Sequence, residues 1–539
     1  MLIMIILVLC AVPPVSRDAL THHLAVPKLY IEHGHMRELP EIIPSYFPMN
    51  LDMLFLIPLL WGNDILPKYI HMAFGLFTAV LLYRYLRDRL NRIYGILGML
   101  LFLSLPIIVQ LAITVYVDLG LIFFSTAALA YLLDWRKGGW QGRHLFLAAV
   151  CCGLALGTKY NGLVVFLLLT LAVLIIAGRK PVVLGERAGA SGELQSVVRP
   201  ALIFVAVALL LYAPWALRNY VWTGNPFFPL LDTVFNPQSP YIENRLNPLV
   251  MRRLAYGESL WETLLVPIRI FFQGQDDVPA LFDGRLNAYL LLFPIFGFFP
   301  SKHQSQGVQF EKAVWGGFAL LFIIIVFFTR DMRIRYIAPA IPALVVLSVF
   351  GIENLFSGLR RLDNPTMRRG LQFVSMLVIV FLISQNAIYL LHKWQQVRPL
   401  DYLSGKMDRT TYVTHYRPEY EVIRYANQTL GAADRILCVF MGNRHYYFDS
   451  DPLFLEWPEF KRLVGQAPDA EGLAKRIGQN GISHVMIGME GLLHWSRQSL
   501  TIDEQAKVRQ WLQNHLEILK ESNGYALFKL HQEAVTKTK

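Results

Sequence analysis

Long apolar runs separated by short polar loops dominate the chain as far as His392. A helix needs about 20 apolar residues to cross a bilayer, so most of these runs predict membrane-spanning helices. The runs are Leu2–Pro13, Pro67–Leu86, Ile93–Leu111, Val117–Leu133, Leu145–Leu156, Gly162–Ala177, Ala201–Trp215, Ala288–Phe299, Ala313–Phe328, Tyr336–Leu355 and Leu371–Leu391. The first is short, so either its helix begins at the membrane surface or the chain begins further upstream. The pattern predicts a mainly α fold, a polytopic helical membrane bundle of about eleven spans.

Lysine and arginine cluster in the loops on one side of these runs. Loops on the cytoplasmic side of a membrane carry an excess of such residues, which places the N-terminus in the cytoplasm. The inner loops then hold Arg84, Arg87, Arg89, Arg92, Arg136, Lys137, Arg143, Arg179, Lys180, Arg187, Arg199, Arg360, Arg361, Arg368 and Arg369. The larger loops 16–63 and 218–287, and the residues after His392, lie outside, where we expect the function.

The sequence changes character at Lys393, where the long apolar runs stop. Helix-like stretches then alternate with short strand-like ones: Pro418–Leu430, Arg435–Phe440, Ile482–Gly488, Ile502–Leu519 and Tyr525–Leu530. Asn523 and Gly524 supply a turn before the last of them. We therefore expect a membrane domain over residues 1–392 and a small soluble α/β domain over residues 393–539 on the outer face.

Composition excludes several classes of protein. With 54% hydrophobic residues, 17% charged residues and a mean hydropathy of +0.40, the chain is too apolar for a soluble protein. The net charge of +11 would suit a nucleic-acid partner, but the basic residues lie in short loops between spans, so none is expected. The sequence has no phosphate-loop or H-E-x-x-H motif, and its 4 cysteines are too few for a disulfide framework.

The first outer loop holds a carboxylate between two segments suited to a membrane surface. Asp18–Tyr30 places Leu20 and Leu24 among polar residues, as in a helix that lies on a membrane. Asn50–Trp61 is apolar enough to lie in the interface. Asp18 would then meet a lipid-linked substrate at the height of its phosphate.

Several short motifs follow one another in a distinctive order. They are Asp18 to Leu24, Pro27, Lys28, Phe47, Pro48, Asn50, Tyr116 to Asp118, Gly157 to Gly162, Pro214, Trp215, Arg218, Asn219, Gly224 to Pro226, Arg335, Tyr336, Pro339 and Pro342. In order and spacing they resemble the bacterial C-type glycosyltransferases, relatives of the protein O-mannosyltransferases and of the transferase that adds aminoarabinose to lipid A. The resemblance covers the whole membrane part.

The resemblance implies an inverting transfer of a sugar from a polyprenyl-phosphate donor, with Asp18 as the catalytic base and Asp118 as a second catalytic residue. One base suffices for direct displacement, because phosphate is a good leaving group and only the acceptor's proton must be taken up. Basic residues at the outer ends of spans would bind the donor phosphate. These are Lys159, Arg218, Arg330, Arg333 and Arg335, with Lys159 and Arg335 foremost.

Each of these residues also has an explanation without function. Ser16 could cap a helix whose first turn holds Asp18, where an acidic side chain interacts favourably with the helix dipole. Asp118 could likewise only cap the span that it opens. Arginines at span ends often reach lipid headgroups without binding a ligand. Asp18 and His22 lie four residues apart and could hold a divalent cation, so metal dependence stays open and no cofactor is assigned.

The rival function is that of a transporter, either a flippase for lipid-linked sugars or a secondary carrier, which predicts mid-span charges and broken helices in an internal repeat. A scaffold that has lost activity is a third alternative. For a transferase the acceptor could be a protein, a lipid or a polysaccharide. Aromatic residues of the long outer loop, Tyr241, Trp261, Phe271 and Phe272, could cover the donor or line an acceptor groove. The resemblance places the chain in a bacterial plasma membrane, with its C-terminal domain outside.

Overall fold

The computed structural model describes residues 1–179, 190–238, 248–299, 305–329, 331–431, 433–479 and 481–531. Arg330 and Tyr241 lie outside these described residues. The chain divides into two compact units. The helical unit consists of Met1–Cys10, Tyr46–Pro58 and Leu66–Arg398, and the sheet unit of Ala11–Ser45, Leu59–Ile65 and Pro399–Lys539.

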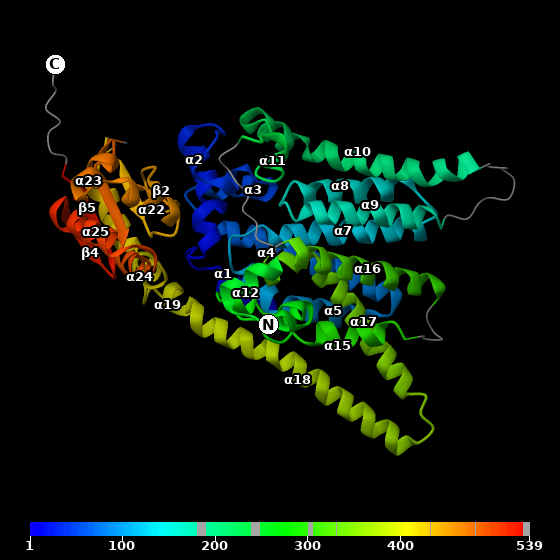
Figure 1. Cartoon of the computed structure of the whole chain (residues 1–539). Coiled ribbons are helices and arrows are strands. Elements are labelled where there is room, and N and C mark those ends of the chain that lie inside the picture. Colours follow the sequence, from blue (N-terminus) through cyan, green and yellow to red (C-terminus); the bar gives the residue numbers. More distant parts are fainter. Residues whose placement is uncertain are drawn as a thin grey trace. The chain divides into compact units, whose positions relative to one another are not determined.

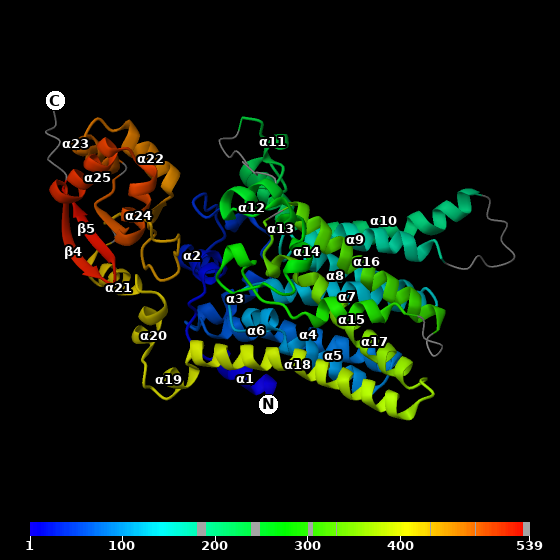
Figure 2. The ribbon, with the colours of Figure 1, turned by 60° about the horizontal axis from the view of Figure 1, so that its bottom comes forward.

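The long helices of the helical unit lie side by side (Figure 1, Figure 2). In chain order the elements are α1 Leu2–Cys10, α3 Asn50–Leu60, α4 Leu66–Arg89, α5 Arg92–Ser104, α6 Pro106–Ala112, α7 Asp118–Lys137, α8 Gly142–Leu156, α9 Gly162–Ala177, α10 Ala190–Thr223, α11 Asp232–Phe235, α12 Pro248–Tyr256, α13 Leu260–Leu264, α14 Val266–Arg269, η3 Pro279–Leu281, α15 Tyr289–Gly297, α16 Gln306–Thr329, η4 Ile334–Ala340, α17 Ile341–Leu359 and α18 Pro365–Val397. Every apolar run that the sequence marked out forms the body of one helix or of two consecutive ones. The mainly helical fold class is confirmed.

In the described chain, 6 helices are long and apolar enough to cross a membrane, or up to 7 if the bent pair α5–α6 is one span. The pair bends by 66° where Pro106 opens α6, because proline lacks the N–H that would continue a helix. The remaining apolar runs form helices shorter than a bilayer core requires: α1, α8, α9 and α15. The chain is therefore a multi-span membrane protein, with fewer full-length spans than its apolar runs alone suggest.

The spanning helices differ in how much protein covers them. The span Ile334–Leu359, which contains α17, has 83% of its apolar window buried, whereas the span that begins with α18 has 17% buried. Exposed side chains of α18 include Phe373 and Phe381. α17 thus forms the centre of the unit, and α18 presents the apolar surface expected of a helix in contact with lipid.

Glycines permit close helix contacts inside the unit. A Cβ placed on Gly351 of α17 would lie 1.9 Å from the carbonyl oxygen of Phe293 in α15. A Cβ on Gly153 of α8 would lie 2.8 Å from the carbonyl oxygen of Ala208 in α10. Because lipid competes for apolar contacts, close backbone approach of this kind is a main source of helix association in membranes.

The sheet unit is built on a five-stranded sheet with the order β2-β1-β3-β5-β4. The strands are β1 Ile436–Val439, β2 Leu453–Leu455, β3 His484–Gly488, β4 Leu516–Ser522 and β5 Tyr525–Leu530. β1 is parallel to β2 and β3, whereas β5 is antiparallel to both β3 and β4. The expected turn at Asn523–Gly524 joins β4 to β5, with φ of 53° and 80° at the two residues.

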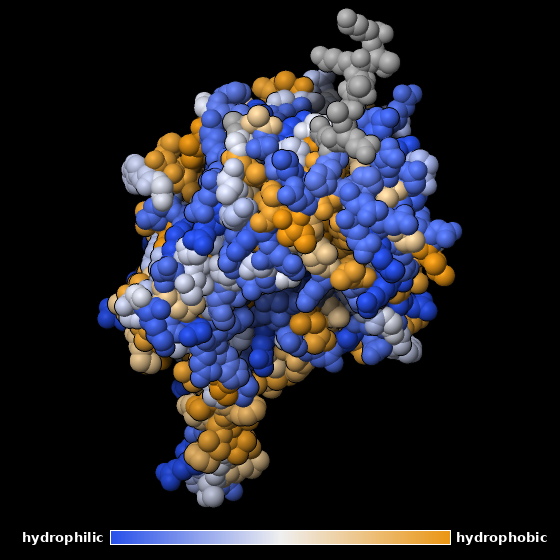
Figure 3. Space-filling model, turned by 90° about the vertical axis from the view of Figure 1, so that its left-hand side faces the viewer, coloured by the Kyte–Doolittle hydropathy of each residue, from blue (hydrophilic) through white to orange (hydrophobic). Residues whose placement is uncertain are grey.

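Helices cover both faces of this sheet. The helices of the C-terminal part are α19 Pro399–Leu403, α20 Arg409–Tyr416, α21 Tyr420–Thr429, α22 Trp457–Gln466, α23 Ala470–Gly478, α24 Met489–Ser499 and α25 Ile502–Asn514. Of these, α21 packs on one face of the sheet, and α22 to α25 pack on the other. Leu437 and Val439 of β1 join one hydrophobic cluster, and Ile436 and Cys438 join another, because successive strand residues point to opposite faces. The face of the unit seen in Figure 3 is mainly hydrophilic, with hydrophobic residues in separate patches. A small α/β domain at the C-terminal end is confirmed.

The sheet unit also contains most of the first loop. The π-helical turn η1 Ala19–His23 leads into α2 Ala25–His33, and η2 Ile43–Tyr46 follows. The carbonyl oxygen of Leu20 accepts a hydrogen bond of 3.0 Å from the backbone N–H of Tyr446, and Tyr447 Oη donates one of 2.7 Å to the carbonyl oxygen of Pro14. The expected boundary at residues 392/393 stays a prediction, but the first loop folds with the C-terminal residues and not as part of the helical unit.

Candidate functional site

A buried ion pair joins two of the residues that the sequence singled out. Asp118 is the first residue of α7, and its side chain is 1% exposed. Lys159 lies in the loop between α8 and α9, and its Nζ is 2.8 Å from Oδ1 of Asp118. Oδ2 of Asp118 has no hydrogen-bond partner among the described residues. A buried carboxylate is stable only when paired, so each of these two residues holds the other in place.

Arg335 brings a second positive charge to this pair. It lies on η4, with its guanidinium carbon 5.2 Å from the centre of the Tyr116 ring and 5.5 Å from that of Tyr336. Lys159 Nζ lies 5.9 Å from the same Tyr336 ring, and both cations act electrostatically on Asp118. The structure thus brings Asp118, Lys159 and Arg335 together from three separate segments; we call them the charged cluster. Guanidinium and ammonium groups gathered at one point are the donors that suit a phosphate.

The loop that carries Lys159 is held by the motif residues on either side of it. The carbonyl oxygen of Gly157 accepts a hydrogen bond of 2.9 Å from the backbone N–H of Asn50. A Cβ on Gly157 would lie 2.2 Å from Nδ2 of Asn50, so a larger residue has no room there. Asn161 Nδ2 donates a hydrogen bond of 3.0 Å to the carbonyl oxygen of Tyr336. The loop is therefore fixed to α3 and to η4, which carries Arg335.

Arg218 belongs to a neighbouring network. Its Nη2 donates a hydrogen bond of 3.1 Å to the carbonyl oxygen of Phe47, and its guanidinium carbon lies 4.7 Å from the Trp215 ring centre. Asn219 Nδ2 donates to the hydroxyl of Tyr160 over 3.2 Å, which links this network to the Lys159 loop. Arg218 has structural contacts that explain its place in the motif, and its role in phosphate binding stays a prediction.

Arg333 contributes less to the cluster. Arg333 forms an ion pair of 3.2 Å with Asp283, and both side chains are partly exposed. Its charge is therefore offset, although it lies two residues from Arg335. Arg330 is outside the described residues, and its role stays a prediction.

Asp18 lies in the sheet unit, directly before η1. It is the N-cap residue of that turn, but its backbone is helical and its side chain forms no capping hydrogen bond there. A purely structural role as a helix cap is thus not observed. Leu20 and Leu24, expected to face the membrane, are 1% and 0% exposed, so protein covers them.

The arrangement of Asp18 and His22 differs from that expected for an α-helix. η1 is a π-helical turn in which Leu24 N–H donates to the carbonyl oxygen of Ala19, five residues back. Residues four apart therefore do not align as they do in an α-helix. His22 Nδ1 lies 2.8 Å from Thr21 Oγ1. The described residues contain no group of three or more His, Cys, Asp or Glu side chains that could hold a metal.

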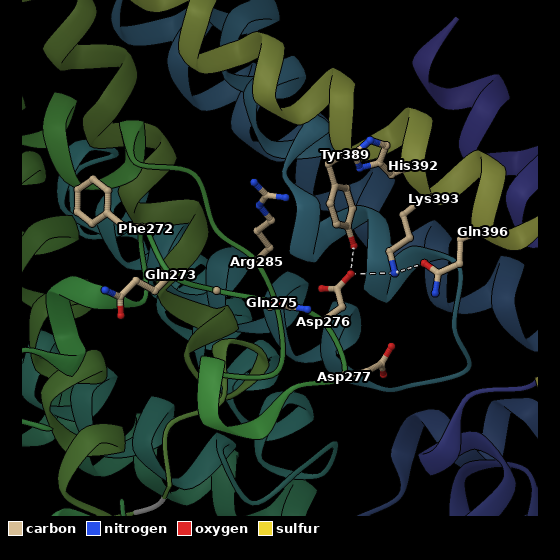
Figure 4. Close-up of a pocket in the computed structure, with 11 residues that line it drawn as sticks. Phe272, Gln273, Gln275, Asp276, Asp277, Arg285, Tyr389, His392, Lys393 and Gln396 are labelled. Carbon is tan, nitrogen blue, oxygen red and sulfur yellow. Dashed lines mark hydrogen bonds and ion pairs between the residues drawn. The ribbon is translucent and has the colours of Figure 1, made fainter. Parts of the chain in front are cut away.

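The helical unit also contains a polar pocket that the sequence did not reveal (Figure 4). Its volume is about 490 Å³. Lys393 Nζ lies 2.8 Å from Oδ2 of Asp276, and Tyr389 Oη donates a hydrogen bond of 2.6 Å to the same oxygen. Figure 4 shows Tyr389 and Lys393 of α18 converging on Asp276, with Arg285 on the same wall. The only signal in the sequence was the i, i+4 spacing of Tyr389 and Lys393, which does not show their partner.

A backbone hydrogen bond connects η4 with the loop that contributes Asp277 and Arg285 to this pocket. The backbone N–H of Ile334, next to Arg335, donates a hydrogen bond of 2.8 Å to the carbonyl oxygen of Phe282, in the loop that lines the pocket. Of the aromatic residues expected to meet a ligand, Phe271 is 4% exposed, whereas Phe272, which lines the pocket, and Trp261 are 58% and 73% exposed. Two of the four are thus available at the surface, and Tyr241 lies outside the described residues.

Comparisons with known proteins give a family match for part of the chain and similar folds for nearly all of it. A family model described as dolichyl-phosphate-mannose-protein mannosyltransferase matches residues 63–223, which include Asp118 and Lys159. ArnT from Cupriavidus metallidurans, solved bound to undecaprenyl phosphate, has a similar structure, with a TM-score of 0.56 and 14% identity over 98% of this chain and 96% of ArnT. An oligosaccharyltransferase from Archaeoglobus fulgidus, solved in complex with Zn and sulfate, has a TM-score of 0.54 and 11% identity over 96% of this chain and 71% of that protein. No curated protein matches the sequence.

Proposed function

We propose that this chain, which has the fold of the C-type glycosyltransferases, transfers a sugar from a polyprenyl-phosphate donor to an acceptor outside the cytoplasm. The observation that carries the proposal is the convergence of Asp118, Lys159 and Arg335 at one end of the spanning helices. The match of residues 63–223 to the mannosyltransferase model supports a transferase, and the undecaprenyl phosphate bound to ArnT supports the donor class.

Lys159 and Arg335 bind the donor phosphate in this proposal. As the bond between the anomeric carbon and the phosphate oxygen breaks, its electron pair leaves with the phosphate, whose negative charge increases. Cations already fixed in position stabilise that charge without reorganising. Asp118 keeps Lys159 in place, because the ion pair and the anchored loop fix the position of the ammonium group.

Asp18 is the proposed general base. The acceptor's oxygen attacks the anomeric carbon from the face opposite the phosphate, so the configuration inverts, and its proton passes to the Asp18 carboxylate. Arg218, Arg330 and Arg333 are assigned to the phosphate side as secondary contacts. A bacterial plasma membrane, with the N-terminus in the cytoplasm and the C-terminal domain outside, remains the proposed location.

The test measures transfer of radiolabelled sugar from a panel of polyprenyl-phosphate donors, with purified protein and membrane extract as acceptor. We expect product from the wild type and none above background from Asp18→Asn. Asp503→Asn is the matched control, because it makes the same change at an exposed position of α25 in the same unit. Label that crosses vesicle membranes without product, in both the wild type and Asp18→Asn, would instead identify a flippase.

A further inference from the structure

Two adjoining cavities lie at the end of α7 remote from Asp118. The basic pocket, of about 540 Å³, is lined by Arg89, Arg136, Lys137 and Arg179 together with Asp88 and Glu311. An apolar groove of about 210 Å³ runs between α9 and α16. Arg179 lines both cavities, and Phe310 of the groove packs against Arg136 of the basic pocket, so the two cavities adjoin.

The acidic residues of the basic pocket are already paired. Glu311 accepts a hydrogen bond of 2.8 Å from Arg89 Nε and one of 2.7 Å from Tyr85 Oη. Asp88 lies 2.8 Å from Arg87. Both carboxylates are thereby neutralised by arginines and leave the other cations of the pocket without an acidic partner.

Three cations of the basic pocket form no ion pair with any carboxylate in the described part of the chain: Arg136, Lys137 and Arg179. The guanidinium carbons of Arg136 and Arg179 lie 4.4 Å and 4.6 Å from the centre of the same Phe310 ring. Two positive charges gathered at one ring repel each other, and an anion between them would remove that repulsion. The pocket is thus complementary to a phosphate.

The basic pocket lies at the height of lipid headgroups. α7 has 20 residues and begins at Asp118, so its other end, with Arg136 and Lys137, is roughly 30 Å away along the helix. That distance matches the thickness of a bilayer core. Trp135 and Trp140 pack together there, with ring centres 5.0 Å apart, as aromatic residues do at a membrane interface. The basic pocket therefore belongs to the membrane face opposite the charged cluster.

We propose that these cavities bind one anionic glycerophospholipid of that leaflet. Its phosphate lies between Arg136 and Arg179 in the basic pocket, and one acyl chain follows the groove past Leu171, Ile175 and Leu321. A free phosphate would explain the basic pocket but not the apolar groove that continues from it. Basic pockets between spanning helices are suited to anionic headgroups. The site is separate from the donor site, and its occupancy does not depend on glycosyl transfer.

The headgroup is tested by titrating the delipidated full-length protein in detergent with phosphatidylglycerol or phosphatidylcholine of identical chains, and counting bound lipid by native mass spectrometry. We expect phosphatidylglycerol to bind more tightly than phosphatidylcholine. The double variant Arg136→Gln with Arg179→Gln should weaken the binding of phosphatidylglycerol roughly 30-fold, because two positive charges that contact the headgroup are lost. Arg368→Gln with Arg369→Gln removes the same charge from α18 and should change nothing. Equal affinity for the two lipids, or equal loss in the control, would overturn the proposal.

The groove is tested separately through Gly317, which lines it. A Cβ on this residue meets nothing within 4 Å, so Gly317→Leu fills the groove without disturbing the protein. It should weaken binding of long-chain phosphatidylglycerol severalfold and leave a short-chain analogue unaffected, whereas Gly358→Leu, also in open space, should affect neither. If inorganic phosphate competes as strongly as the lipid, or Gly317→Leu has no effect, the site is not a lipid site.

Discussion

Replacing Lys159 with methionine would leave Asp118 as a buried carboxylate without its partner. The side chain of Asp118 is 1% exposed and that of Lys159 is 17% exposed, so the carboxylate cannot reach water whereas the ammonium group partly can. We therefore expect Lys159→Met to lower the free energy of unfolding by about 3–5 kcal/mol. Asp118→Asn, which leaves a partly hydrated lysine, should cost less, about 1–3 kcal/mol.

The double variant separates structure from function. Asp118→Asn with Lys159→Met removes both charges, so most of the stability lost in Lys159→Met should return, with a coupling energy of about 1–3 kcal/mol. Sugar transfer should not return, because the donor phosphate has still lost a cation. Stability is measured by denaturant titration of the purified protein, and transfer by the radiolabel assay.

Two outcomes would refute this reasoning. If the losses of stability in the single variants simply add in the double variant, the ion pair is not an energetic unit. If the double variant recovers transfer together with stability, Lys159 is a structural partner of Asp118 and does not bind the donor.

Two further predictions concern other parts of the chain. Burial lowers the pKa of His445 from 6.5 to about 4, so on acidification the unfolded state takes up a proton at this residue before the folded state does. The stability that is present above pH 6.5 should therefore fall by up to about 3 kcal/mol as the pH drops to 4. His445→Gln should flatten this dependence in thermal unfolding between pH 7 and pH 4; an unchanged slope would assign it to other groups. Gly351→Ala places a Cβ 1.9 Å from the carbonyl oxygen of Phe293 and should cost about 1–3 kcal/mol or more. Gly317→Ala, in open space, should leave the same denaturation midpoint unchanged, and equal effects of both would contradict the packing argument.

The sequence predicted helices well where their apolar runs were long, and less well where tertiary contacts decide the conformation. The stretch Ile502–Leu519 reads as one segment, but α25 ends at Asn514 and β4 begins at Leu516. β4 forms because it pairs with β5 across the Asn523–Gly524 turn. Such pairing depends on residues elsewhere in the sheet, which a local pattern does not contain.

In the candidate site, too, the sequence identified single residues but not the contacts between them. Asp118, Lys159 and Arg335 were each identified from their motifs, yet the ion pair between the first two was not predicted, because they lie 41 residues apart, on α7 and in the loop between α8 and α9. The pair of Asp276 and Lys393 was missed entirely. Each residue alone is an ordinary loop or helix-end charge, and only the folded chain shows that they meet.

The sheet unit combines segments from the beginning and the end of the chain, and this affects the order in which it can fold during synthesis. The segment with Asp18 leaves the ribosome early, but Lys28 Nζ donates to the carbonyl oxygen of Tyr446, and Arg409 pairs with Asp64. At 5–20 residues per second, the stretch between Ser45 and Pro399 takes roughly tens of seconds to synthesise. Throughout that interval the first loop lacks the partners with which it folds. The proposed base would thus be completed last, which would keep a half-made chain from acting on the donor.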